Sequence, residues 1–243
     1  MPKHHSRLPW RRPLFIAVFS ISFIFISQSS AEPSADATGI IDSIVRAAGM
    51  NDLSNIMEID FTFSAKLSSG KVLRQWQWFP RTDDVIFTGK SPNGKKETVT
   101  YSRKALAGMR KEAAVHTIDA WFVNDRYWLL FPYFLATDPQ KRVTRDNSAV
   151  MPLSGKWATG VTVEYYRPDP KRPGDKFELF VDSTYLIKEW IFYPYESFKP
   201  TSTNKWESYS TIGPFTVSLD RPAKDSKGIA VKMSNVKIGK AGE

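Results

Sequence analysis

Few residues in this sequence could perform catalysis. His116 lies on a predicted helix with Asp119 three residues later, which could serve as a general base or a metal ligand. It is the one histidine beyond residue 31, so no second imidazole is available for a histidine-based metal site. We therefore interpret His116 as a surface or partly buried helix residue.

Carboxylates and catalytic motifs lead to the same conclusion. The Asp83–Asp84 and Asp119/Asp125 pairs could be read as acid–base pairs, but adjacent residues of an extended chain point to opposite sides, and a turn explains Asp83–Asp84. The sequence has no G-x-S-x-G, P-loop or G-x-G-x-x-G motif, and no cysteine. We expect no catalytic residue, no metal ion, no cofactor and no disulfide.

Aromatic side chains are the distinctive chemical feature, with 8 Trp, 16 Phe and 9 Tyr among 243 residues. They are densest over residues 121–134, around Pro132. Such a segment could complete the core or line an apolar cavity, and composition leaves both open. The candidates for a hydrophobic cavity are Trp76, Trp78, Trp121, Phe122, Tyr127, Trp128, Phe131, Tyr133, Trp190 and Phe192.

The first 31 residues have the features of an export signal. Four basic residues and no acid precede an apolar run, Leu14 to Ile26, and the segment ends in Ser29-Ser30-Ala31. As a helix this run would span about 20 Å, short of the roughly 30 Å hydrocarbon core of a membrane. We predict cleavage after Ala31 and a periplasmic protein, with an uncleaved anchor as the alternative.

The elements that must position the aromatic residues follow from hydrophobic periodicity. After a short tether (32–37), one domain is expected over 38–243, beginning with an amphipathic helix over 38–50. Helical spacing returns over 112–126, and Pro132 prevents a simple continuous helix through the aromatic stretch. Residues 138–147 suggest a loop or short strand. Strands with a period of two are expected over 57–64, 72–78, 85–88, 97–101, 161–166, 177–182, 186–193, 205–211, 215–219 and 229–238.

Charge argues against nucleic acid as a partner. The net charge of +9 falls to +5 once the four basic residues of the export signal are removed. The remaining basic residues are interspersed with acids, and the densest cluster, Lys171-Arg172 with Lys176, lies in a proline-rich loop. A charge of +5 is compatible with approach to anionic membrane surfaces.

The order of these elements resembles the LolA/LolB-like superfamily of periplasmic lipoprotein carriers. The resemblance covers most of residues 38–238, and its most distinctive part is the stretch Ala120 to Pro132, AWFVNDRYWLLFP. It implies an α+β fold with one strongly curved antiparallel sheet, an open, unclosed β-barrel of about nine to eleven strands capped by helices. The missing cysteine does not support a lipid-anchored receptor.

The resemblance also implies a non-enzymatic role in outer-membrane biogenesis, with a cavity that binds acyl chains. We therefore expect a monomeric carrier or binding protein for a lipid or a lipidated protein, with transient contact with a membrane surface left open. The alternative is an envelope interaction or structural protein whose core is filled by its own side chains and which binds no ligand.

Overall fold

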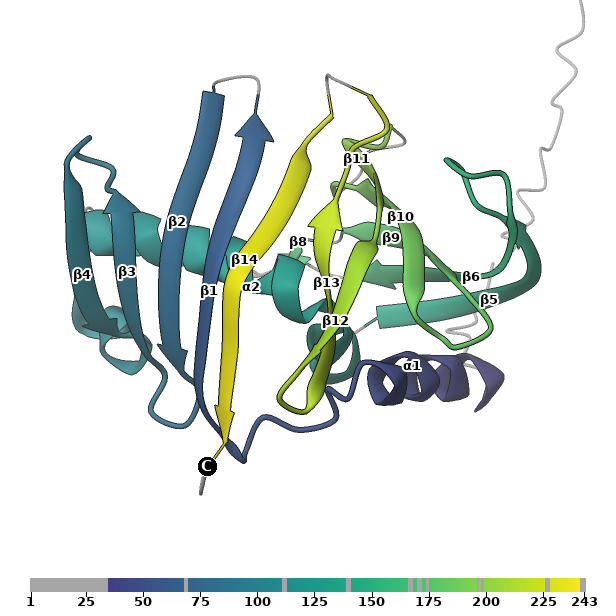
Figure 1. Ribbon diagram of the computed structural model, residues 1–243, viewed down its shortest axis with the longest axis horizontal. Coiled ribbons are helices and arrows are strands. Elements are labelled where there is room, and N and C mark those ends of the chain that lie inside the picture. The colour runs from purple at the N-terminus through teal and green to yellow at the C-terminus, as the bar shows by residue number, and fades with distance from the viewer. Residues whose placement is uncertain are drawn as a thin grey trace, which may run out of the picture. The chain divides into compact units, whose positions relative to one another are not determined.

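The computed structural model describes residues 35–240 apart from 68–69, 111–112, 139–140, 166–167, 170–171, 174, 196, 198 and 226–227 (Figure 1). The predicted export signal and its cleavage site lie outside the described residues. In the described chain, no helix combines the length and the apolar character needed to cross a membrane.

The fold is α+β, with two antiparallel sheets and two α-helices. The helices are α1 (Ala35–Ala47) and α2 (Ala114–Thr137), and a 3-10 helix, η1 (Arg103–Gly108), precedes α2. The larger sheet has seven strands in the order β12 (Glu207–Ile212), β13 (Phe215–Arg221), β14 (Ala230–Lys240), β1 (Ile56–Leu67), β2 (Gly70–Phe79), β3 (Asp84–Lys90) and β4 (Lys96–Ser102). The smaller has five, in the order β11 (Ser202–Lys205), β10 (Ile187–Tyr193), β9 (Lys176–Val181), β6 (Trp157–Tyr165) and β5 (Lys141–Val150). β7 (Pro168–Asp169) and β8 (Arg172–Pro173) form a separate two-stranded ribbon.

The period-two segments form the strands they predict because one face of each is buried. In β1, Ile59, Phe61 and Phe63 are at most 3% exposed and face the interior. Trp76 and Trp78 continue the same buried layer on β2, where Trp76 pairs with Phe61 in the register. The segment over 138–147 is β5, which begins at Lys141.

The expectation of one strongly curved sheet is wrong. Apart from the β7–β8 ribbon, the strands of the described residues form two sheets, and neither is closed or strongly curled. The predicted strand over 205–211 corresponds to β12 from Glu207 onward, but its first residue, Lys205, ends β11, which belongs to the other sheet.

Trp206, the residue between β11 and β12, explains the separation. Its amide donates to the Lys188 carbonyl of the smaller sheet at 2.7 Å, and its side chain is 2% exposed. Immediately before it, Lys205 N donates to the Pro222 carbonyl after β13 at 3.2 Å. A buried tryptophan at this corner lets the chain leave one sheet and enter the other without exposing apolar surface.

The aromatic stretch continues α2 through a kink, so the helix is not simply continuous, as Pro132 predicts. Leu130 has non-helical backbone angles (φ −112°, ψ 29°), two residues before Pro132. Proline lacks the amide proton for a bond to the carbonyl four residues earlier, so the helix kinks there and then resumes. Figure 1 shows α2 crossing behind the strands of the larger sheet.

α1 begins three residues before its predicted start and ends near Gly49, which adopts φ +68°. A Cβ at Gly49 would lie 2.1 Å from the Pro214 carbonyl oxygen, so a side chain cannot be accommodated. Thr216 N also donates to the Ala48 carbonyl at 2.9 Å, which fixes the end of α1 on the β12–β13 turn.

A pair of carboxylates lies on the face of the larger sheet that is turned away from α2. Burial, together with the neighbouring Glu58 carboxylate, raises the pKa of Asp60 to about 6 against the opposing effect of Lys237. Gln77 donates its amide to Glu58. Because the folded-state pKa of Asp60 lies above its ordinary value, ionised Asp60 lowers the free energy of unfolding at neutral pH.

We predict that Asp60→Asn increases stability at pH 7 by about 1 kcal/mol, a value reduced for solvent screening. The native chain should lose stability as pH rises from about 4 to about 6, and this variant should lose less. Urea unfolding at several pH values checks both. Asp42→Asn, at an exposed position on α1, is the control. Equal pH dependence in the Asp60 variant and the native chain would contradict the assignment.

Candidate ligand-binding site

α2 supplies the aromatic side chains that join the two sheets. Its first half meets the larger sheet, where the ring of Phe122 lies 5.4 Å from that of Trp76 and 5.7 Å from that of Trp78. After the next two turns it meets the smaller sheet, where Phe131 lies 5.2 Å from both Phe177 and Trp190. One helix therefore fills the space between the sheets.

A buried ion pair attaches α2 to the larger sheet. Arg74 on β2 donates to both carboxylate oxygens of Asp125 at 2.6 and 2.9 Å. Trp76 Nε1 and Asn124 Nδ2 also donate to this carboxylate, at 2.9 and 3.0 Å. Burial raises the pKa of Asp125, which is 0% exposed, while these donors oppose the rise. The Arg74 guanidinium also lies 5.0 Å from the ring centre of Trp121.

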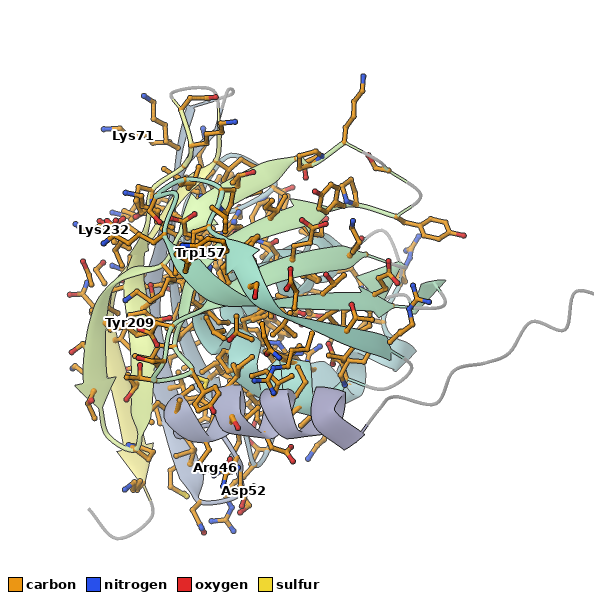
Figure 2. The ribbon with its side chains drawn as sticks, turned by 90° about the vertical axis from the view of Figure 1, so that its right-hand side faces the viewer. Arg46, Asp52, Lys71, Trp157, Tyr209 and Lys232 are labelled. Carbon is orange, nitrogen blue, oxygen red and sulfur yellow. The ribbon has the colours of Figure 1, made fainter. Side chains whose placement is uncertain are left out.

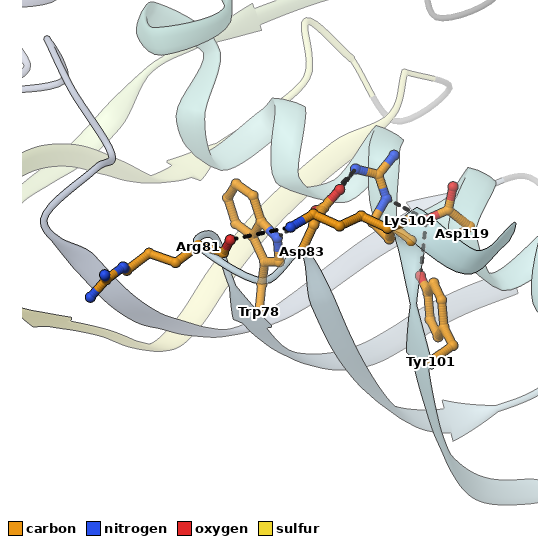
Figure 3. A network of polar contacts seen from close by, with 7 residues as sticks. Trp78, Arg81, Asp83, Tyr101, Lys104 and Asp119 are labelled. Carbon is orange, nitrogen blue, oxygen red and sulfur yellow. Dashed lines mark hydrogen bonds and ion pairs between the residues drawn. The ribbon is translucent and has the colours of Figure 1, made fainter.

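A second polar network surrounds Arg103 at the start of η1 (Figure 3). Its Nε donates to Asp119 on α2 at 2.6 Å, and its Nη1 donates to Asp83 at 3.2 Å. Tyr101 donates to Asp119 at 3.2 Å, and Trp78 Nε1 donates to Asp83 at 3.1 Å. Burial alone would lower the pKa of Arg103, but the two carboxylates outweigh it and raise that pKa. Asp83 lies in the expected turn and has φ +62°.

A cavity of about 510 Å³ lies between α2 and the β9–β10 strands, and we name it the aromatic cavity. Its apolar lining comes from α2 and from these two strands. Polar lining comes from the first turns of α2, from Arg103 and from Asp175. The residues around it are Arg103, His116, Asp119, Ala120, Val123, Asn124, Tyr127, Trp128, Asp175, Phe177, Trp190 and Phe192.

A second cavity, of about 750 Å³, borders it and is here named the polar cavity. The two share Arg103, Val123 and Tyr127 as lining. Its walls carry four basic side chains, Arg81, Arg103, Lys104 and Arg126, and three acidic ones, Asp52, Asp83 and Asp138. This charge makes it a poorer place for an apolar ligand than the aromatic cavity.

The ten aromatic residues singled out from the sequence divide into three groups. Tyr127, Trp128, Trp190 and Phe192 line the aromatic cavity. Trp78 and Tyr133 line the polar cavity, as does Tyr127. The others border neither cavity; Trp76, Phe122 and Phe131 are at most 3% exposed, and Trp121 is partly buried against the core.

Sequence reasoning considered His116 and Asp119 only as a possible general base or metal ligand, and it did not predict the Arg74–Asp125 ion pair. Arg74 interrupts an apolar strand face, and Asp125 stands within an aromatic helix, so two charges in apolar surroundings could have suggested a buried pair. Phe177 was not among the cavity candidates but lines the aromatic cavity. His116 was interpreted as a helix residue. It is partly exposed, but its Nε2 is buried beside the aromatic cavity without a hydrogen-bond partner in the described structure.

The described residues contain no group of three or more potential metal ligands among His, Cys, Asp and Glu.

Comparison with known proteins finds likeness in fold only. No family model and no curated protein matches the chain. A LolA superfamily protein from Nitrosomonas europaea is 9% identical, with 81% of this chain and 92% of that chain covered and a TM-score of 0.45. A structure described as a putative outer membrane lipoprotein-sorting protein domain, from Vibrio parahaemolyticus, is 11% identical over 86% and 94% of the chains, with a TM-score of 0.46.

A DUF1329 family protein from Desulfovibrio piger is 8% identical over 83% of this chain and 92% of that chain, with a TM-score of 0.40. The structural neighbours are thus LolA superfamily and lipoprotein-sorting domain proteins and a DUF1329 protein, at low sequence identity. The resemblance drawn from the sequence names the same superfamily.

We predict that Arg74→Met lowers the free energy of unfolding by about 3–5 kcal/mol, because Asp125 stays buried without its ion partner. The double variant Arg74→Met/Asp125→Asn should recover at least half of this loss, since the amide oxygen introduced at position 125 can still accept from Trp76 Nε1 and no charge remains buried. Urea unfolding of both variants measures the difference. A double variant less stable than Arg74→Met would contradict the assignment.

Proposed function

We propose that the protein is a non-catalytic periplasmic carrier whose aromatic cavity holds an apolar ligand, a lipid or the acyl chain of a lipidated protein. The observation that carries the proposal is the cavity of about 510 Å³ with aromatic walls from both α2 and the smaller sheet. Ligand pockets commonly enclose about 300–1,000 Å³ and combine apolar walls with a few polar groups.

The lining changes character along α2, which favours an amphiphilic ligand. His116 and Asp119 lie at one end, and Tyr127 and Trp128 lie at the other. With a rise of 1.5 Å per residue, the distance from position 116 to position 128 is about 18 Å. An acyl chain would contact the aromatic end, while its polar head would meet the first turns of α2 and Arg103.

Burial of a chain in this cavity would supply binding energy without any reacting group. Each buried methylene contributes about 0.8 kcal/mol, so an eight-carbon segment contributes about 6 kcal/mol before the cost of ordering. That energy offsets part of the cost of removing a lipid from a bilayer.

A filled interior favours the competing candidate, an envelope interaction protein that binds no ligand. Phe122 and Phe131, both 0% exposed, occupy the space between the sheets that an open barrel would leave hollow. Under this alternative the aromatic cavity is only a surface groove, and purified protein would contain no lipid.

Solvent extraction separates the two candidates. The protein is purified after export from its native envelope, extracted with organic solvent, and the extract is examined by mass spectrometry. The carrier predicts lipid in stoichiometric amount. Repeated absence of lipid, together with no uptake of a fluorescent fatty acid, would reject it.

We predict that Ala120→Trp lowers the affinity for a fluorescent fatty acid at least about tenfold, because the added ring enters the aromatic cavity and displaces ligand. Ala120 is an exposed residue of α2 that lines this cavity, so the fold should tolerate the change. Thr117→Trp is the matched control, since Thr117 is exposed on the same helix and lines neither cavity. Equal uptake by the two variants would place the ligand elsewhere.

A further inference from the structure

Five lysines gather on one end of the larger sheet, on the face turned away from α2. They are Lys66 and Lys71 beside the β1–β2 turn, Lys90 and Lys96 beside the β3–β4 turn, and Lys232 on β14. All five are exposed, and we name them the lysine patch. Figure 2 shows Lys71 and Lys232 on this outer side of the sheet, toward the same end.

The strand register places these charges directly opposite one another. Lys66 pairs with Lys71 across β1 and β2, and Lys90 pairs with Lys96 across β3 and β4. Like charges at directly opposed positions of an antiparallel pair are destabilising. The sheet therefore gains no stability from either pair.

The patch continues across neighbouring strands. Ser64 on β1 pairs with Lys232 on one side and with Leu73 on the other. Leu73 lies one position beyond the Arg74–Gly89 pair, beside Lys90, and is 61% exposed. From β14 to β4 the patch crosses four strand spacings, about 19 Å, so it is a broad surface.

The lysines of this patch differ from those on the smaller sheet. Lys176, Lys188 and Lys205 lie within 4.0 Å of the carboxylates of Glu178, Asp182 and Glu207. In the part of the chain that the structure describes, none of the five patch lysines has a carboxylate within that distance. Lys232 is paired with Asp220 across β14 and β13 in the register, and the charge of the other four lysines is available to an external partner.

We propose that the lysine patch docks the protein on the surface of a bilayer that contains anionic phospholipids. A broad array of flexible point charges suits a diffuse layer of phosphate groups, whereas recognition of a defined carboxylate typically uses the planar fork of arginine. An exposed leucine among the lysines can enter the interfacial region of the lipid. The proposal does not depend on a ligand in the aromatic cavity.

Sedimentation with lipid vesicles tests this docking. The protein purified after export is mixed with phosphatidylcholine vesicles, with and without phosphatidylglycerol. We expect binding only when phosphatidylglycerol is present, and weaker binding as the ionic strength rises. The variant Lys66→Gln/Lys90→Gln/Lys232→Gln should bind at least about tenfold more weakly, since each lysine near an anionic surface adds to the attraction.

The matched control, Arg46→Gln/Lys156→Gln/Lys199→Gln, loses the same charge at exposed positions outside the patch and should bind nearly as well as the native chain. Thermal unfolding of the patch variant should show little loss of stability, because one lysine of each like-charged pair is removed and the exposed Lys232 loses only its cross-strand pairing with Asp220. Equal weakening in both variants, equal binding to neutral vesicles, or binding to an acidic protein but not to vesicles would overturn the proposal.

Discussion

Burial of α2 between two sheets is the interaction on which the other parts of the structure depend. From Asp125 to Leu135 nearly every side chain of this helix is buried, so the helix needs partners all round and not on one face only. Phe122 packs against β2, and Phe131 packs against β9 and β10. The kink at Leu130 and Pro132 lets one helix serve both surfaces.

Apolar packing is non-directional, so it does not by itself fix the position of α2. Polar contacts fix that position. Arg74 reaches Asp125, and Arg103 links Asp119 to Asp83 in the turn after β2. Buried charges cost free energy unless they are paired, so a shifted helix would lose these contacts together. The cavities remain beside α2 where the smaller sheet and the β2–β3 turn do not close completely over it.

The two proposed activities occupy different sides of the larger sheet. The aromatic cavity lies on the side of α2, where apolar rings and a few polar groups meet. The lysine patch lies on the opposite face, at the turns of two hairpins. A carrier of apolar ligands and a surface that contacts a bilayer would complement each other, because such ligands reside in membranes.

The sequence alone determined the strands and helices whose patterns are local. Alternation from Met57 to Ser64 predicts β1 because the face of each residue follows from its neighbours, except at Met57, which a register shift leaves 41% exposed. Pro132 predicts the kink in α2 from local geometry as well. Only the tertiary structure decided that Lys205 ends β11 in one sheet while β12 begins at Glu207 in the other, since that depends on hydrogen bonds from Trp206 to Lys188 and from Lys205 to Pro222. Likewise, both Phe131 and Trp128 are aromatic residues of one helix. Whether each fills the core or lines a cavity depends on how closely the distant strands β9 and β10 approach it.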